Sequence, residues 1–196
     1  MAGRAVLIAY AAAPWILWPL SFVVLREHFI WAMAASTGIL GAATLALLGS
    51  SDQLRPKPRW ALAAAVYTAI LYLAFAAGNA LAEALGLGGG VEEVYRMVGR
   101  SPLLAAPLAW IGFWEEVYWR AGLQENLVAE RLGKPWFLAS IPYALVHVST
   151  GNPVLVAAAL VVGLVLGHEA HRYGAAASAA SHVAWLYLVL LAAPLR

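Results

Sequence analysis

Long apolar runs alternate with short polar connections along the whole chain. A membrane-spanning helix needs about 20 consecutive apolar residues. The pattern predicts seven candidate spans, with six or eight as alternatives: Ala5–Leu25, Phe29–Leu48, Trp60–Leu85, Pro102–Leu123, Trp136–Val148, Val154–Gly167 (continuing to about His171) and Ala175–Leu195. The fifth of these runs is short for a full crossing. We therefore expect an all-α, polytopic transmembrane helical bundle of about seven spans.

The connections between the runs carry turn residues and few charges. Gly49–Arg59 is a polar loop with two prolines, and Ser149–Pro153 is a strong turn signal. Val91–Val98 predicts a short helix after three glycines, and we interpret its acidic pair as solvated surface. Gly163 and Gly167 form a G-x-x-x-G pattern, which predicts close helix contact. No repeat or long linker divides the chain, so residues 1–196 predict a single integral membrane domain.

Composition supports a membrane protein. Hydrophobic residues make up 63% of the 196 residues and charged residues 11%, against roughly 45–50% and about 25% in soluble domains. Lipid must cover this apolar surface. The chain has no cysteine, which excludes disulfides and thiolate zinc sites. Its formal charge of +2 is too small to indicate a nucleic-acid partner.

The basic residues of the connections predict the orientation. Seven fall on one side of the predicted membrane: Arg4, Arg55, Lys57, Arg59, Arg131, Lys134 and Arg172. Four fall on the other: Arg26, Arg96, Arg100 and Arg196. Cytoplasmic connections carry the excess of Lys and Arg. We therefore expect an integral protein of the plasma membrane with a cytoplasmic N-terminus.

The fourth apolar run contains three charges, Glu115, Glu116 and Arg120. Charges inside a membrane segment cost a few kcal/mol each and indicate a functional site. On a helix, Glu116 and Arg120 lie about 40° apart and can pair, whereas Glu115 and Arg120 lie about 140° apart. Glu115 is thus the freer carboxylate, and a desolvated carboxylate can act as a general base. The alternative is an ion-paired helix end near the interface.

Two histidines in other runs add to this cluster. His147 follows Tyr143 by one helical turn in the fifth run, and His182 lies near the start of the seventh. Taken alone, each histidine is more often a structural group. Together with Glu115 they form a set from three helices that has the parts needed to bind or activate a water.

These motifs, in this order, resemble the CPBP intramembrane protease family. The family includes the type II CAAX prenyl endopeptidases and abortive-infection-like bacterial relatives linked to bacteriocin processing or immunity. The resemblance implies a catalytic core at about residues 101–192. It assigns Glu115 as the water-activating glutamate, with Glu116 and Arg120 in support. It matches His147 and His182 to the two motif histidines, and Tyr143 to a position where the family usually has Phe.

Two positions depart from the family pattern. The family usually has an Asn four residues after the last histidine, and this chain has Leu186 there. Ala121 replaces the Gly that usually follows the arginine. The Asn is thought to help hold the oxyanion or the water of the site, and losing one oxyanion donor costs about 10²–10³ in rate. The indole N–H of Trp185 is a candidate replacement.

The resemblance implies an intramembrane endopeptidase of the CAAX-processing type. Its substrate would be a membrane-associated or prenylated peptide, its other partner membrane lipid. Glu115 would activate a water that His147 positions, and His182 would stabilise the oxyanion. The cofactor is left open: zinc held by Glu115, His147 and His182 is one alternative, and a mechanism without metal is the other.

Two other functions stay open at this stage. A non-catalytic scaffold or immunity protein of the same fold would explain the loss of the family's Asn at Leu186. A proton-coupled transporter would also use buried glutamates and histidines, although the sequence contains no inverted repeat.

Overall fold

The computed structural model describes residues 3–99 and 101–195, and in this part of the chain all regular structure is helical. In chain order the elements are α1 (Arg4–Ala12), α2 (Pro14–Pro19), η1 (Leu20–Val24), η2 (Arg26–His28), α3 (Phe29–Leu48), η3 (Ser50–Leu54), α4 (Trp60–Ala84), α5 (Gly88–Val98), η4 (Pro102–Leu104), α6 (Ala105–Glu116), η5 (Val117–Arg131), η6 (Trp136–Ala139), α7 (Ser140–Leu145), η7 (Val148–Thr150), α8 (Pro153–Tyr173), α9 (Ala175–Tyr187) and η8 (Leu188–Ala192).

Five helical stretches of the described residues are long and apolar enough to cross a membrane: Arg4–Val24, Arg26–Leu48, Trp60–Ala84, Pro153–Tyr173 and Ala175–Ala192. They match five of the seven predicted spans. The fourth predicted segment is helical as well, through α6 and η5. The fifth is broken into η6, α7 and η7, which together are too short to cross a hydrocarbon core of about 30 Å as one helix. The protein is a polytopic helical membrane protein.

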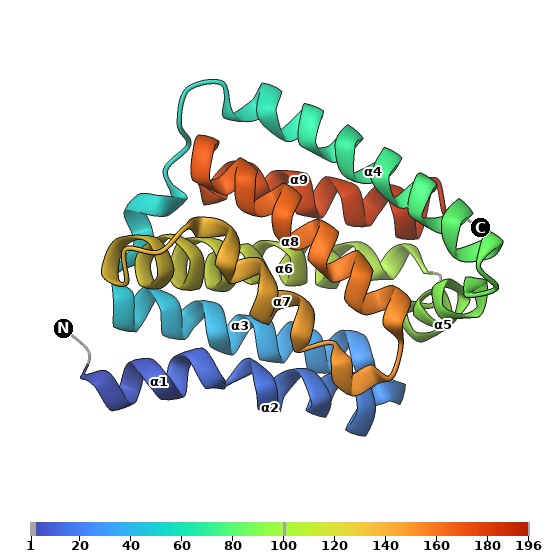
Figure 1. The fold of residues 1–196 in the computed structure, drawn as a ribbon, viewed down its shortest axis with the longest axis horizontal. Coiled ribbons are helices and arrows are strands. Elements are labelled where there is room, and N and C mark those ends of the chain that lie inside the picture. The colour runs from blue at the N-terminus through green and yellow to red at the C-terminus, as the bar shows by residue number, and fades with distance from the viewer. Residues whose placement is uncertain (1–2, 100, 196) are drawn as a thin grey trace.

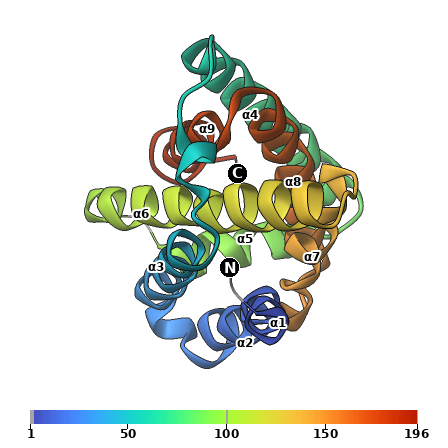
Figure 2. The same ribbon diagram turned by 90° about the vertical axis from the view of Figure 1, so that its left-hand side faces the viewer.

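The helix formed by α6 and η5 lies at the centre of the bundle. Figure 2 shows it crossing the middle of the molecule, with α1, α2 and α3 on one side and α4 and α9 on the other. It packs directly against α3 and α9, and α8 contacts α4, α7 and α9. The short helix α5 lies at the end of the bundle away from the N-terminus (Figure 1). A charged side chain on α6 is therefore surrounded by other helices and shielded from lipid.

The outer surface is apolar. Large hydrophobic side chains such as Ile16, Val24, Leu62 and Leu73 are each more than 60% exposed. In water this surface would cost about 25 cal/mol per Å² of apolar area, and a lipid environment removes that cost. Inside, the largest fully buried side chains are Trp18 and Trp119, and Trp119 follows the glutamates by one helical turn.

The predicted close contact at Gly163 and Gly167 is present. A Cβ atom at Gly163 would lie 3.0 Å from Ser140, and one at Gly167 would lie 2.8 Å from the side-chain oxygen of Gln124. The absence of side chains at these two glycines lets α8 approach α7 and η5 closely. Arg100 and Arg196, which entered the prediction of orientation, lie outside the described residues.

Candidate functional site

The two adjacent glutamates lie where the central helix changes its backbone geometry. Glu115 and Glu116 end the α-helical stretch, and from Val117 to Arg131 the helix is π-helical, with hydrogen bonds to the carbonyl five residues earlier. Such wider turns are rare and occur frequently at functional sites. Both glutamates are buried, Glu115 at 7% exposure and Glu116 at 0%.

Glu116 is held by two partners from different elements. Arg120 Nε donates to Glu116 Oε2 at 3.2 Å, as the four-residue spacing predicts. His182 Nδ1 lies 3.0 Å from Glu116 Oε1. Since a carboxylate only accepts, this histidine nitrogen carries its proton and donates it. Glu116 thus joins η5 to α9 and fixes the orientation of the His182 ring.

Glu115 has a different environment. Tyr143, from α7, donates its hydroxyl to Glu115 Oε2 at 3.1 Å. His182 Nε2 lies 3.9 Å from the same oxygen, which is too long for a hydrogen bond. The other carboxylate oxygen, Oε1, has no protein hydrogen bond among the described residues. Glu115 is therefore the carboxylate with free capacity to accept a proton, as the helix geometry predicts.

His147 is fixed by contacts at both ring nitrogens. Its Nδ1 lies 2.9 Å from the carbonyl oxygen of Tyr143, and Trp18 donates its indole N–H to Nε2 at 3.3 Å. Both contacts fit one neutral tautomer, with the proton on Nδ1. Trp18 is fully buried on α2. In this structure Nε2 of His147 is therefore occupied by the tryptophan.

These side chains border one large cavity. Its volume is about 490 Å³, and its wall includes Glu115, Tyr143, His147 and His182 together with many apolar side chains of α4, α5, α8 and α9. Pockets that bind small molecules typically measure 300–1,000 Å³ and are mostly apolar, with a few convergent polar groups. The arrangement provides a buried carboxylate, two imidazoles and a phenol beside space for an apolar ligand.

Trp185 lies beside His182 on the same cavity wall. The two ring centroids are 5.9 Å apart, and Trp185 is 8% exposed. Its indole N–H is buried and has no hydrogen-bond partner among the described residues. Leu186 also lines the cavity, at the position where the resembled family usually has Asn. The unpaired indole N–H of Trp185 thus lies next to position 186, where the resembled family usually has the side-chain amide of Asn.

A metal does not fit these side chains as they stand. Among the described residues, no three His, Asp or Glu side chains come together as a metal-binding group. Of the three predicted zinc ligands, Glu115 and His182 are near neighbours, whereas Nε2 of His147 accepts from Trp18 and its Nδ1 faces a carbonyl.

The structure brings together five of the six predicted site residues, namely Glu115, Glu116, Arg120, Tyr143 and His182, through direct contacts. The guanidinium carbon of Arg120 lies 4.8 Å from the centroid of the Tyr143 ring. The sixth, His147, is joined to them through its bond to Tyr143 and through the shared cavity.

Sequence reasoning missed Trp18. A tryptophan in an apolar run is typical of a membrane-interface anchor, and nothing in the local pattern marks it as a partner of His147. The acidic pair on α5 lies at the surface, as the sequence predicts, with Glu92 exposed and the Glu93 side chain 35% exposed. The sequence did not predict that Glu93 accepts hydrogen bonds from Arg26 and Asn152.

Comparison with known proteins agrees with the motifs. Residues 98–188 match the family model described as type II CAAX prenyl endopeptidase Rce1-like. The matched segment contains the two glutamates, Arg120, Tyr143 and both histidines, and it leaves out α1 to α4. The comparisons with curated proteins and with solved structures find no match.

Proposed function

We propose that this chain, which belongs through residues 98–188 to the type II CAAX prenyl endopeptidase Rce1-like family, hydrolyses a membrane-associated or prenylated peptide with Glu115 as the general base. The observation that carries the proposal is the position of Glu115. Its buried carboxylate borders a cavity of about 490 Å³, with Tyr143 and His182 beside it.

The first step is activation of a water. Glu115 takes a proton from a water in the cavity, and the resulting hydroxide forms a bond to the scissile carbonyl carbon. Tyr143 donates to Oε2 of Glu115 and so directs Oε1 toward the water. His147 positions the same water once its bond to Trp18 opens.

The second step is stabilisation of the oxyanion. The ring of His182 is held in place by Nδ1–H, which donates to Glu116, and its Nε2 side faces the scissile carbonyl and stabilises the oxyanion. The free indole N–H of Trp185 supplies a second donor in place of the amide lost at Leu186. The tetrahedral intermediate then breaks its C–N bond, and Glu115 returns the proton to the leaving amine.

The cavity also supports the substrate class. Its lining is mostly apolar, with contributions from Phe75 on α4 and Met97 on α5. A prenyl chain is a flexible hydrocarbon, and its burial stabilises the complex by about 25 cal/mol per Å² of apolar area. We propose in addition that residues 101–192 are the catalytic core of one integral membrane domain, in the plasma membrane with a cytoplasmic N-terminus.

Cleavage by the purified protein tests the proposal. The full chain in detergent is incubated with a peptide that ends in a prenylated Cys-a-a-X sequence, and the products are identified by mass spectrometry. We expect release of the C-terminal tripeptide by the wild type and a loss of at least 10²-fold in kcat for Glu115→Gln. Glu125→Gln is the matched control, because Glu125 pairs with His171 away from the cavity, and it should cleave like the wild type.

The two alternative functions give different results. A scaffold or immunity protein would bind the prenylated peptide and leave it intact in both the wild type and the variant. A transporter would produce a proton flux in liposomes that Glu115→Gln abolishes, again without cleavage. Either result would overturn the proposal.

A further inference from the structure

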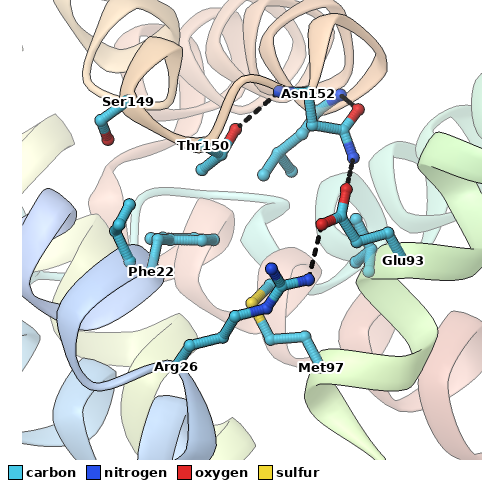
Figure 3. A pocket seen from close by; sticks show the side chains of 10 residues that line it. Phe22, Arg26, Glu93, Met97, Ser149, Thr150 and Asn152 are labelled. Atoms are coloured by element: carbon cyan, nitrogen blue, oxygen red, sulfur yellow. Dashed lines mark hydrogen bonds and ion pairs between the residues drawn. The ribbon is translucent and has the colours of Figure 1, made fainter.

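A second, smaller pocket adjoins the large cavity at the end of the bundle where α5 lies. Its volume is about 110 Å³, and it is lined by Arg26, Glu93, Ser149, Thr150 and Asn152 together with apolar side chains. Figure 3 shows Arg26, Glu93 and Asn152 in a row along one wall, with Phe22 on the opposite side. Unlike the large cavity, this pocket is polar on one side.

The pocket already holds a carboxylate, which is that of the protein's own Glu93. Arg26 Nη2 donates to Glu93 Oε1 at 2.5 Å, and Asn152 Nδ2 donates to Glu93 Oε2 at 3.2 Å. Each carboxylate oxygen thus has its own donor. Asn152 is fixed in turn, because its backbone N–H donates to Thr150 and its side-chain oxygen accepts from the N–H of Leu155.

The two donors come from connections far apart in the chain. Arg26 lies on η2, directly after the first span, and Asn152 directly precedes α8. Glu93 reaches them from the short helix α5. The donors therefore belong to the bundle, whereas the carboxylate is carried by a separate short element.

The contact between Arg26 and Glu93 is open to exchange. The two side chains are 51% and 35% exposed. Ion pairs with this degree of exposure contribute little, typically 0–1 kcal/mol. A carboxylate supplied by a ligand can replace that of Glu93 without breaking a buried pair.

The polar pocket is continuous with the candidate active site. Phe22, Val94, Met97 and Leu155 line both the pocket and the large cavity. The ring of Phe22 contacts the ring of His147, with 5.3 Å between their centroids. The shared wall gives an extended tripeptide, about 10 Å long, a continuous path from the large cavity past Phe22 into the polar pocket.

We infer that Arg26 and Asn152 form the binding site for the C-terminal carboxylate of the substrate, and that Glu93 occupies this site when no substrate is bound. The inference rests on the proposed function, in which the peptide ends three residues beyond the cleaved bond and therefore carries a free carboxylate there. The apolar cavity takes the lipid chain, and the polar pocket selects peptides by their C-terminus.

Paired substrates test this inference. The full chain in detergent is given two prenylated peptides of the same sequence, one with a free C-terminal carboxylate and one with a C-terminal amide. We expect the wild type to have a KM for the free acid about 5-fold or more below that for the amide, because a charge-assisted hydrogen bond to Arg26 is lost with the amide. The value of kcat should change little.

Two variants with matched controls assign the effect to the pocket. Arg26→Gln should raise the KM for the free acid to that for the amide. Glu93→Gln, which removes the competing carboxylate, should lower the KM for the free acid. The controls are Arg96→Gln and Glu92→Gln. Both residues are exposed and lie on α5, the helix that carries Glu93. Both variants should keep the wild-type preference for the free acid over the amide.

The outcomes separate this inference from the proposed function. Cleavage of both peptides with equal KM values by the wild type and by Arg26→Gln would overturn the inference alone. If neither peptide is cleaved, the proposed function fails and the inference fails with it.

Discussion

Arg120 is a buried cation whose guanidinium group is only partly hydrogen-bonded. Its side chain is fully buried, and the two terminal guanidinium nitrogens have no hydrogen-bond partner among the described residues. Its stabilising contacts are the bond from Nε to Glu116 and the face of the Tyr143 ring. A buried ion pair gains little over an apolar pair, but loss of one partner leaves an uncompensated charge.

Arg120→Met should therefore destabilise the protein strongly. We expect the free energy of unfolding to fall by about 3–5 kcal/mol, because Glu116 keeps its charge and loses its cation. Unfolding in detergent, followed by circular dichroism, measures the change.

An exposed pair of similar spacing provides the control. Arg55 and Asp52 are 82% and 77% exposed, and Arg55→Met should change the free energy of unfolding by less than about 0.5 kcal/mol. Equal effects of the two variants would contradict the view that burial makes Arg120 costly to replace.

Among the contacts of single residues, the sequence predicted the ion pair along the central helix and the grouping of Glu115 with His182, and it missed the contacts of Trp18 and Glu93. The spacing of Glu116 and Arg120 predicted their ion pair because helix geometry relates residues four positions apart. No such rule relates Trp18 to His147 or Glu93 to Arg26. Those contacts depend on how distant helices pack, which local pattern does not encode.

At the element scale, α2 reaches the site from outside the segment that matches the family. Trp18 donates to His147 and packs edge-on against Trp119. The N-terminal span thus fixes His147, which we propose takes part in catalysis, as well as contacting lipid. This support predicts that a change on α2 alters the chemistry of a residue on a different element.

Trp18→Phe tests that link. The phenyl ring keeps most of the packing and loses the N–H that occupies Nε2 of His147. We expect the ¹⁵N chemical shift of His147 Nε2 to move, with loss of about 1 kcal/mol of unfolding free energy for the missing hydrogen bond. NMR on histidine-labelled protein measures the shift.

Trp15→Phe is the matched variant on the same helix, since Trp15 is about half exposed at the surface. It should leave the His147 signals unchanged. A Trp18→Phe spectrum identical to the wild type would contradict a role of Trp18 in fixing the histidine.

Element boundaries show the same limit of sequence reasoning. The five long apolar runs were predicted well, because length and hydropathy alone define a span. The change from α- to π-helix after Glu116 and the division of the fifth run into three short helices were not predicted. Both features depend on how other helices pack around the central helix. The pattern of apolar residues along the chain does not predict that packing.

At the scale of the whole molecule, the connections assemble at two opposite ends as the alternation of runs predicts. Gln53 donates to Glu130 at one end. Arg26, Glu93 and Asn152 meet at the other. The broken fifth segment therefore still carries the chain from one end of the bundle to the other, and the polar pocket lies at the end predicted to face away from the cytoplasm.

Cysteine labelling tests the orientation without background, because the chain contains no cysteine. Ser51 and Ser149 are both exposed, at opposite ends. In intact cells an impermeant maleimide should label Ser149→Cys and leave Ser51→Cys unlabelled until the membrane is opened. The reverse pattern would place the N-terminus outside and turn the polar pocket toward the cytoplasm.

The proposed hydrolysis requires Glu115 to activate a water within the membrane. A single-turnover reaction in H₂¹⁸O, with the prenylated peptide and analysis by mass spectrometry, tests it most directly. We predict one ¹⁸O atom in the new carboxylate of the lipidated product from the wild type, and no product from Glu115→Gln. Cleavage by Glu115→Gln at the wild-type rate, or a wild-type product without ¹⁸O, would contradict the account.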